Sequence, residues 1–458
     1  MLKKENPLVA AVEFFVDNYV NVEQFSGKVK NDNGGAPAIH PKMMLKILFY
    51  SYANSIYSSR EIEKRLSWDP YYIYLAGNQS VDHSTICNFI LKYSEEIKNI
   101  FTLLVYLMTK LGYVTLDFVA IDGTKIKANV SKEFSGTVKE FKDKQKRIEN
   151  KIEQIINHTL SAEQDERCVS RIHKKIDELQ RKKKKIDEFL KDVENCTDMK
   201  ATQQINLTDK DARKVKDNDK YMGYNCHIAV DANRHVIISN EVFNTASDRN
   251  LLRPMIEEIR TVIKEDTEIG FDSGYFSSEN LKYCVEQNLN VYLPEGKGDG
   301  GKKRVKNKTI CSRDCRLEID GKVKRLTCPG EQIMETTYAT KDRNNYYYKF
   351  YPKKDVCDLC TLKEKCYGNA KKKRFVVKKE YFDALAIREK MTKKLLSKRG
   401  KQRIADRACV VEHVFGEIKE LFNFRRFLHR TLRKVRVIWN LICIAYNLRK
   451  LAKLGIGN

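Results

Sequence analysis

The sequence has no long hydrophobic run. Its longest stretch without Asp, Glu, Lys or Arg is the 13 residues from Ile47 to Ser59, whereas a membrane-spanning helix needs about 20 apolar residues. The N-terminal segment also lacks the uninterrupted apolar core of a secretory signal, because Glu13 and Asp17 lie within it. Both absences disfavour a membrane or secreted protein, and we expect a cytoplasmic location.

Acidic residues are too few to balance the basic ones. The chain of 458 residues has 61 Asp and Glu against 86 Lys and Arg, a net charge of +25, and the excess is spread along the chain. A basic surface of this kind indicates a nucleic acid as partner. The 13 cysteines are odd in number and unevenly clustered, which favours reduced thiols or metal sites over a disulfide framework.

Residues 40–112 have a helical pattern. Pro41 precedes a run of apolar residues, and Ser58 and Asp82 are candidate N-caps of two more helices. Short helices in a basic protein fit a helix-turn-helix DNA reader, although any small helical domain has the same pattern. We therefore predict that residues 1–112 form an N-terminal helical domain, which is a candidate DNA-binding domain.

Two aspartates follow short apolar segments. Residues 118–121 lead to Asp122, which Gly123 follows, and residues 268–271 lead to Asp272. A charge at the end of a buried strand is costly unless it is paired or binds a metal, so each aspartate indicates a site. A simple turn or helix-cap role fits such an aspartate about equally well. The two strand ends can meet at one edge of a mixed sheet, where α/β proteins bind their ligands.

The segment between these aspartates combines helices with strands. Residues 138–193 have apolar positions at steps of three and four among many charges, which predicts two amphipathic helices that fold back as a hairpin. Residues 221–231 and 235–239 predict a β-hairpin. We interpret residues 138–196 as a helical-hairpin insertion.

A third carboxylate lies on a C-terminal segment with helical spacing. The apolar stripe of this segment consists of Val411, Val414, Phe415 and Ile418. Glu412 borders the stripe, and Lys419 shares its face if the helix continues for two turns. With Asp122 and Asp272, Glu412 would complete a set of three carboxylates suited to Mg²⁺ or Mn²⁺. Two such ions can stabilise the attacking and leaving oxygens of a phosphodiester displacement.

Three motifs resemble those of the DDE transposases of bacterial insertion sequences. They are IDGTKI at 121–126, DSGY at 272–275 and VEHVFGEIK at 411–419, and further segments extend the resemblance over nearly the whole chain. The resemblance implies an RNase H-like catalytic domain formed by residues 113–290 and 400–458. It also implies that the metal-binding triad, which holds Mg²⁺ or Mn²⁺, consists of Asp122, Asp272 and Glu412.

The resemblance further implies an activity and its partners. Such an enzyme binds the terminal repeats of its mobile element, cleaves phosphodiester bonds with two divalent ions and transfers the 3′ hydroxyl end to target DNA. We expect a homodimer on DNA, associated with the bacterial nucleoid. Two alternatives stay open, namely a metal-dependent nuclease of the same fold without strand transfer and a non-enzymatic DNA-binding relative.

The final helix departs from the family pattern at two positions. Many relatives have a Tyr and an Arg before the Glu, but Ala405 and Ala408 occupy those positions here, and Arg407 is the nearest substitute. By resemblance, Lys419 contacts the DNA backbone close to the cleaved phosphate. Basic residues interleaved with aromatics in the first half of the tail also fit DNA contact. The predicted DNA-binding residues are Lys419, Arg407, Lys125, Arg425 and Arg426. The residues of the tail that we instead expect in the core are Val435, Ile438, Trp439, Ile442 and Tyr446.

Residues 291–399 form a third region, which is rich in cysteine. Cys357 and Cys360 have the two-residue gap that lets both thiolates reach one ion, and Cys328 and Cys366 can complete a four-thiolate zinc site. Free or redox-active thiols are the alternative. Cys311 and Cys315 are alternative zinc ligands, and the sequence does not distinguish between the two possibilities.

These segments together predict an α/β fold class. The fold we expect is an RNase H-like mixed sheet with helices, joined to an N-terminal all-helical domain, a helical-hairpin insertion and a small Cys-rich β insertion with a candidate zinc ribbon. The cofactors implied are Mg²⁺ or Mn²⁺ and one structural Zn²⁺.

Overall fold

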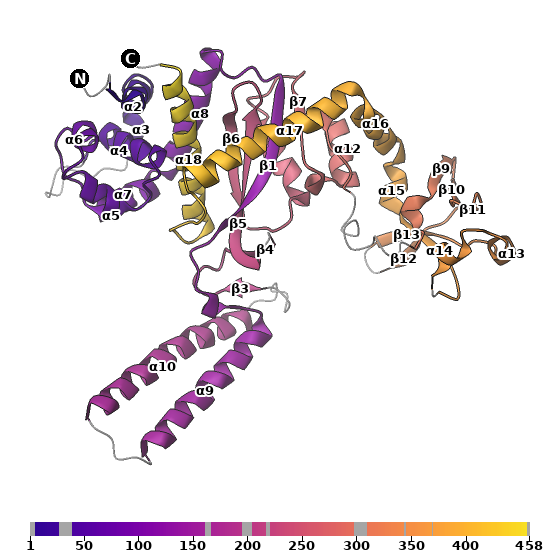
Figure 1. Cartoon of the computed structure of the whole chain (residues 1–458), viewed down its shortest axis with the longest axis horizontal. Coiled ribbons are helices and arrows are strands. Elements are labelled where there is room, and N and C mark those ends of the chain that lie inside the picture. The colour runs from indigo at the N-terminus through magenta and orange to yellow at the C-terminus, as the bar shows by residue number, and fades with distance from the viewer. Residues whose placement is uncertain are drawn as a thin grey trace. The chain divides into compact units, whose positions relative to one another are not determined.

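The structure is a computed structural model in which the chain has a mixed α/β fold (Figure 1). It describes residues 5–26, 39–160, 166–194, 204–216, 220–296, 309–342, 345–368 and 370–455. Within these ranges, no helix is both long enough and apolar enough to cross a membrane.

The chain divides into two compact units. Unit 1 comprises Met1–Thr115, Asp122–Ala246 and Val410–Asn458, and unit 2 comprises Leu116–Ile121 and Ser247–Cys409. The N-terminal helices and the C-terminal end of the chain therefore belong to the same unit.

The N-terminal part of unit 1 is all helical, as the sequence predicts. Asn6, Asp69 and Asp82 cap three of its helices by accepting hydrogen bonds from backbone amides of the first turn. Ser58 occupies the N-cap position of another helix, but its side chain makes no capping bond. The helices are α2 (Pro7–Tyr19), α3 (Glu23–Ser26), α4 (Pro41–Ala53), α5 (Ser59–Arg65), α6 (Pro70–Leu75), α7 (His83–Lys92) and α8 (Ser94–Lys110).

Helix α18 (Leu432–Lys453) forms the centre of unit 1. It packs against α2, α4, α7 and α8 and against the sheet strand β6 (Val236–Phe243). A helix covered on several sides needs apolar residues on several sides. The five residues predicted to lie in the core are all buried, namely Val435, Ile438, Trp439, Ile442 and Tyr446.

A mixed sheet has the strand order β4-β5-β1-β7-β8, with β6 paired to β5. Its other strands are β1 (Phe118–Lys127), β4 (Arg213–Lys216), β5 (Lys220–Asp231), β7 (Glu268–Gly270) and β8 (Asn290–Tyr292). The predicted hairpin is confirmed, because β5 and β6 are antiparallel neighbours. Strands β1, β7 and β8 run parallel, with Phe118 opposite Glu268 and Glu268 opposite Asn290.

Strand β1 does not end at Asp122, and in this respect the sequence-based prediction is wrong. The strand continues to Lys127. Ile126 and Ala128 are buried, and Ala128 N donates a hydrogen bond of 3.0 Å to Met222 O. Pairing with β5 therefore continues past the aspartate, and Asp122 lies in the middle of a strand.

The two long charged helices form the predicted antiparallel hairpin. Helices α9 (Val138–Leu160) and α10 (Glu166–Glu194) run side by side in Figure 1. A small core at the hairpin consists of Phe141 from α9, Ile186, Phe189 and Leu190 from α10, and Ile205, which follows the hairpin in the chain. Short elements at the base of the hairpin are η1 (Lys132–Phe134), β2 (Ser135–Gly136) and β3 (Ile205–Asn206).

The rest of unit 2 contains short helices and two small antiparallel sheets. The two small sheets have the strand orders β11-β10-β9 and β12-β13-β14. These strands are β9 (Arg316–Asp320), β10 (Val323–Thr327), β11 (Ile333–Thr336), β12 (Thr340–Asp342), β13 (Asn345–Phe350) and β14 (Phe375–Lys378). The helices are η2 (Arg249–Leu251), α11 (Leu252–Ile259), η3 (Ser273–Tyr275), α12 (Ser278–Glu286), η4 (Ser312–Asp314), α13 (Lys354–Asp358), α14 (Lys363–Tyr367), α15 (Lys379–Asp383), α16 (Leu385–Leu396) and the first part of α17 (Lys398–Gly416).

Candidate active site

Asp122 lies on β1 next to a glycine that has no space for a side chain. Gly123 N donates a hydrogen bond of 2.7 Å to Asp122 Oδ1. A Cβ atom added at Gly123 would lie 2.4 Å from Nε2 of His227, a residue of β5 that is fully buried. Trp439 Nε1 donates to His227 O at 3.2 Å, so α18 helps to fix this part of β5. The imidazole of His227 therefore packs against the backbone of β1 immediately beside Asp122.

Asp272 lies two residues after the end of β7, close to the strand end that the sequence predicts, and precedes the 3-10 turn η3. Its side chain is 50% exposed, and Arg407 Nη2 lies 3.8 Å from its Oδ1. Gly270 at the end of β7 allows this approach, because an added Cβ would lie 3.2 Å from Cβ of Arg407. Arg407 was predicted to contact DNA, but in the structure its 12% exposed guanidinium lies beside this carboxylate.

Glu412 is exposed on α17, whereas the apolar stripe next to it is buried. The α-helix ends at Gly416, and a π-helix, η5 (Glu417–Leu421), follows it and contains Lys419. The prediction that Glu412 and Lys419 share a face assumed one continuous α-helix, and that assumption is wrong. A π-turn changes the direction in which later side chains point, and such turns occur frequently at functional sites.

The N-terminal helical region contacts the end of this π-helix within unit 1. Tyr57 OH donates a hydrogen bond of 2.6 Å to Phe422 O, and Ser55 Oγ donates one of 3.3 Å to Leu421 O. Arg449 on α18 donates to Ala53 O at 3.1 Å. The segment between α4 and α5 thus helps to hold the backbone that follows Glu412 and Lys419, an arrangement with no signal in the sequence.

Two family models match the chain. A transposase domain (DUF772) matches residues 1–92, and a transposase DDE domain matches residues 327–452. The chain belongs to the DDE-type transposases. Among solved structures, the piggyBac transposase synaptic complex with hairpin DNA is similar to this transposase at a TM-score of 0.34 and 9% identity, over 98% of this chain and 75% of that chain. No curated protein matches the transposase.

The three carboxylates of the transposase lie on separate elements. Asp122 and Glu412 belong to unit 1 and Asp272 belongs to unit 2, so their convergence stays a prediction. Among the residues that the structure describes, no three His, Cys, Asp or Glu side chains are gathered closely enough to hold a metal ion as they stand.

The other predicted DNA-binding residues of the transposase lie in unit 1 near the second half of β1. Burial raises the pKa of the Cys226 thiol, and the charges of Lys125 and Lys419 oppose this rise, so both cations lie close enough to act on that thiol. Arg425 and Arg426 are exposed, and Arg426 Nη2 donates to Asn129 Oδ1 at 3.1 Å.

The segment around Arg426 also pairs with the end of β1. Phe427 N donates a hydrogen bond of 2.9 Å to Lys127 O, and Arg430 Nε donates one of 2.9 Å to Asn129 O. Cationic side chains therefore gather where β1 leaves the sheet.

A buried glutamate that sequence reasoning missed anchors the start of α17 on β7. Glu268 is 5% exposed and accepts hydrogen bonds from Arg399 Nε at 2.8 Å, Arg403 Nε at 2.6 Å and Tyr292 OH at 2.6 Å. Burial alone would raise the pKa of Glu268, but the hydrogen bonds from these three residues outweigh it and lower the pKa. The sequence does contain a sign of this network. Arg399 and Arg403 lie four residues apart and so share one helix face, and Glu268 is the one charged residue of an apolar segment.

We expect Glu268→Gln to lower the free energy of unfolding by roughly 2–4 kcal/mol, because it removes the buried carboxylate that Arg399 and Arg403 share and leaves Arg403 only its 3.3 Å contact with Asp406. The lowered pKa means that Glu268 stabilises the fold fully above the unfolded glutamate pKa of about 4.3. This contribution is lost as the pH falls through the lower folded pKa. Urea unfolding at neutral pH and in acid measures both effects. The exposed Glu286→Gln serves as control, and equal losses in the two variants would contradict the role given to Glu268.

Proposed function

We propose that this transposase binds the ends of its mobile element, cleaves DNA phosphodiester bonds and transfers the freed 3′ hydroxyl end to target DNA. The observation that carries the proposal is the match of residues 327–452 to a transposase DDE domain, which includes Glu412. Asp122 in the middle of a sheet strand and Asp272 two residues after a parallel strand supply the two carboxylates that this chemistry also requires.

The donor chemistry of the three side chains fits Mg²⁺ or Mn²⁺, because carboxylate oxygens are the ligands these hard cations prefer. Asp122, Asp272 and Glu412 would hold the ions. When bound, two such ions stabilise the attacking and leaving oxygens of the displacement. Arg407 beside Asp272 offsets the negative charge of that carboxylate, and we assign it a role in orienting Asp272.

In this proposal the cationic side chains near β1 bind the phosphates of the DNA. Lys125, Lys419, Arg425 and Arg426 lie in the same unit as Asp122, and lysine and arginine contacts to phosphates provide most of the affinity of a protein for DNA. The helical region matched as a transposase domain, residues 1–92, is the candidate reader of the terminal repeats.

The test is incubation of the full chain with labelled DNA from the flanks of its gene and Mg²⁺. We expect cleavage at fixed nucleotides at the element ends, followed by a joined product with target DNA. Cleavage without a joined product would favour a metal-dependent nuclease. Cleavage that is equal in the wild type and in Asp122→Ala would favour a non-enzymatic DNA-binding protein, because the activity would then come from a contaminant.

A further inference from the structure

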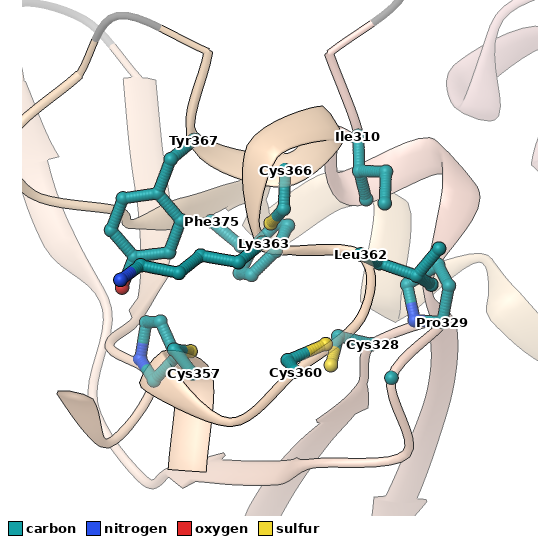
Figure 2. A pocket seen from close by; sticks show the side chains of 12 residues that line it. Ile310, Cys328, Pro329, Cys357, Cys360, Leu362, Lys363, Cys366, Tyr367 and Phe375 are labelled. Atoms are coloured by element: carbon teal, nitrogen blue, oxygen red, sulfur yellow. The ribbon is translucent and has the colours of Figure 1, made fainter. Parts of the chain in front are cut away.

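Four cysteine side chains of unit 2 surround one small cavity (Figure 2). They are Cys328, which follows β10, and three cysteines of the α13–α14 segment, Cys357, Cys360 and Cys366. The cavity has a volume of about 20 Å³, which is room for one water molecule or one ion. Cys311 and Cys315, the alternative ligands, do not line it.

Two of the sulfur atoms already approach the same point. A Cβ atom added at Gly330 would lie 2.8 Å from Cys360 Sγ and 3.8 Å from Cys328 Sγ. Figure 2 shows these two sulfurs next to each other, with Cys357 and Cys366 at other sides of the cavity. The chain turns at each end of the cavity, because Glu331 N donates to Cys328 O at 2.8 Å and Cys360 N donates to Cys357 O at 3.2 Å.

The segment that carries three of these cysteines has no hydrophobic core of its own. Helices α13 and α14 each have five residues, none of them buried, and the intervening Leu359 is 89% exposed. Isolated helices of this length are not stable in water. The adjacent core cluster is also small, made of Ile310, Leu326, Met334, Tyr348, Phe350, Phe375, Val377 and Phe382. Small modules of this kind usually need a disulfide or a metal as a cross-link.

We propose that Cys328, Cys357, Cys360 and Cys366 bind one structural zinc ion. Four thiolates from two separate turns are the donor set of a closed, tetrahedral structural site. Because no three of these thiols lie within the reach of one ion as they stand, binding requires rotation of the side chains toward the centre of the cavity. The four thiols lose four protons on binding.

Lysine side chains next to the cavity favour the negative charge that a zinc–thiolate site would have. A zinc ion with four thiolates has a net charge of −2, and Lys363, which also pairs with Asp358 at 2.9 Å, lines the cavity. The ammonium of Lys373 donates hydrogen bonds of 2.6 Å to both Ile310 O and Cys366 O, which places a second positive charge at the backbone of one ligand. The rest of the lining is mostly apolar and includes Pro329, Leu362 and Phe375.

The experiment measures zinc per chain in the full-length protein purified without chelator. We expect about one equivalent in the wild type, loss of at least half of it in Cys357→Ser and Cys360→Ser, and no loss in Cys311→Ser, the matched control from the same region. Exchange of zinc for Co²⁺ should give the thiolate charge-transfer absorption of a tetrahedral sulfur site, in the wild type and in Cys311→Ser alike. Removal of zinc by a chelator should increase hydrogen exchange in residues 353–368.

Three results would overturn the zinc site. They are the absence of zinc and of the cobalt spectrum in the wild type, an equal loss in Cys311→Ser, or a disulfide between Cys328 and Cys360 in mass spectra of the unreduced protein. Metal content is independent of DNA cleavage, so these outcomes are separate from those that test the transposase activity.

Discussion

Replacing Asp122, Asp272 or Glu412 by alanine is expected to lower DNA cleavage by about a thousandfold or more. The charge stabilisation that a metal supplies to a transition state is worth several kcal/mol, and each loss of about 1.4 kcal/mol is tenfold in rate. Binding of element ends should be retained, or become slightly tighter, because each variant removes a negative charge while the phosphate-binding cations stay in place.

Single-turnover cleavage and gel-shift titration on the same labelled end measure the two effects separately. Glu279→Ala, an exposed acid on α12 in the same unit as Asp272, is the control and should cleave like the wild type. Full cleavage by Glu412→Ala would remove Glu412 from the mechanism. A parallel loss of binding in the triad variants would indicate that the substitutions disturb the fold.

The second large effect is expected at Gly123. In Gly123→Ala, the new methyl group would overlap the imidazole of His227, 2.4 Å away, and neither a central strand nor a buried ring can move freely. Overpacking of this kind costs about 1–3 kcal/mol, and the displaced strand also carries Asp122. We therefore expect a lower free energy of unfolding and a loss of cleavage, measured by urea unfolding and by the cleavage assay.

A double-mutant cycle with His227→Ala identifies the cause. If the clash is responsible, Gly123→Ala should destabilise much less in the His227→Ala background, with a coupling energy above about 0.5 kcal/mol. Gly416→Ala is the control, because that helical glycine has no atom within 4 Å of an added Cβ, and it should be neutral or stabilising. Additive effects at Gly123 and His227 would contradict the proposed contact.

The features that sequence reasoning predicted depend on local patterns. The β5–β6 hairpin follows from alternation and turn residues, the Asp82 cap from one favourable side chain, and the buried face of α18 from residues at helical spacing. The four cysteines around one cavity also agree with a spacing rule, the two-residue gap between Cys357 and Cys360.

The features that it missed depend on partners distant in the sequence. Strand β1 continues past Asp122 because β5, about 100 residues later, pairs with its second half. The Glu268 network joins β7 to arginines more than 130 residues away. The π-helix after Glu412 lies where Tyr57 contacts the chain. The spacing of apolar residues in the sequence does not reveal such contacts. At these places tertiary interactions override the local helix and strand propensities.

The convergence of the three carboxylates is tested most directly by a structure of the full chain with element-end DNA and Mn²⁺, using anomalous scattering to locate the metal. The account predicts two manganese peaks about 3.5–4 Å apart, bound by carboxylate oxygens of Asp122, Asp272 and Glu412. Peaks bound by other residues, or a Glu412 carboxylate far from the metals that Asp122 and Asp272 bind, would contradict it.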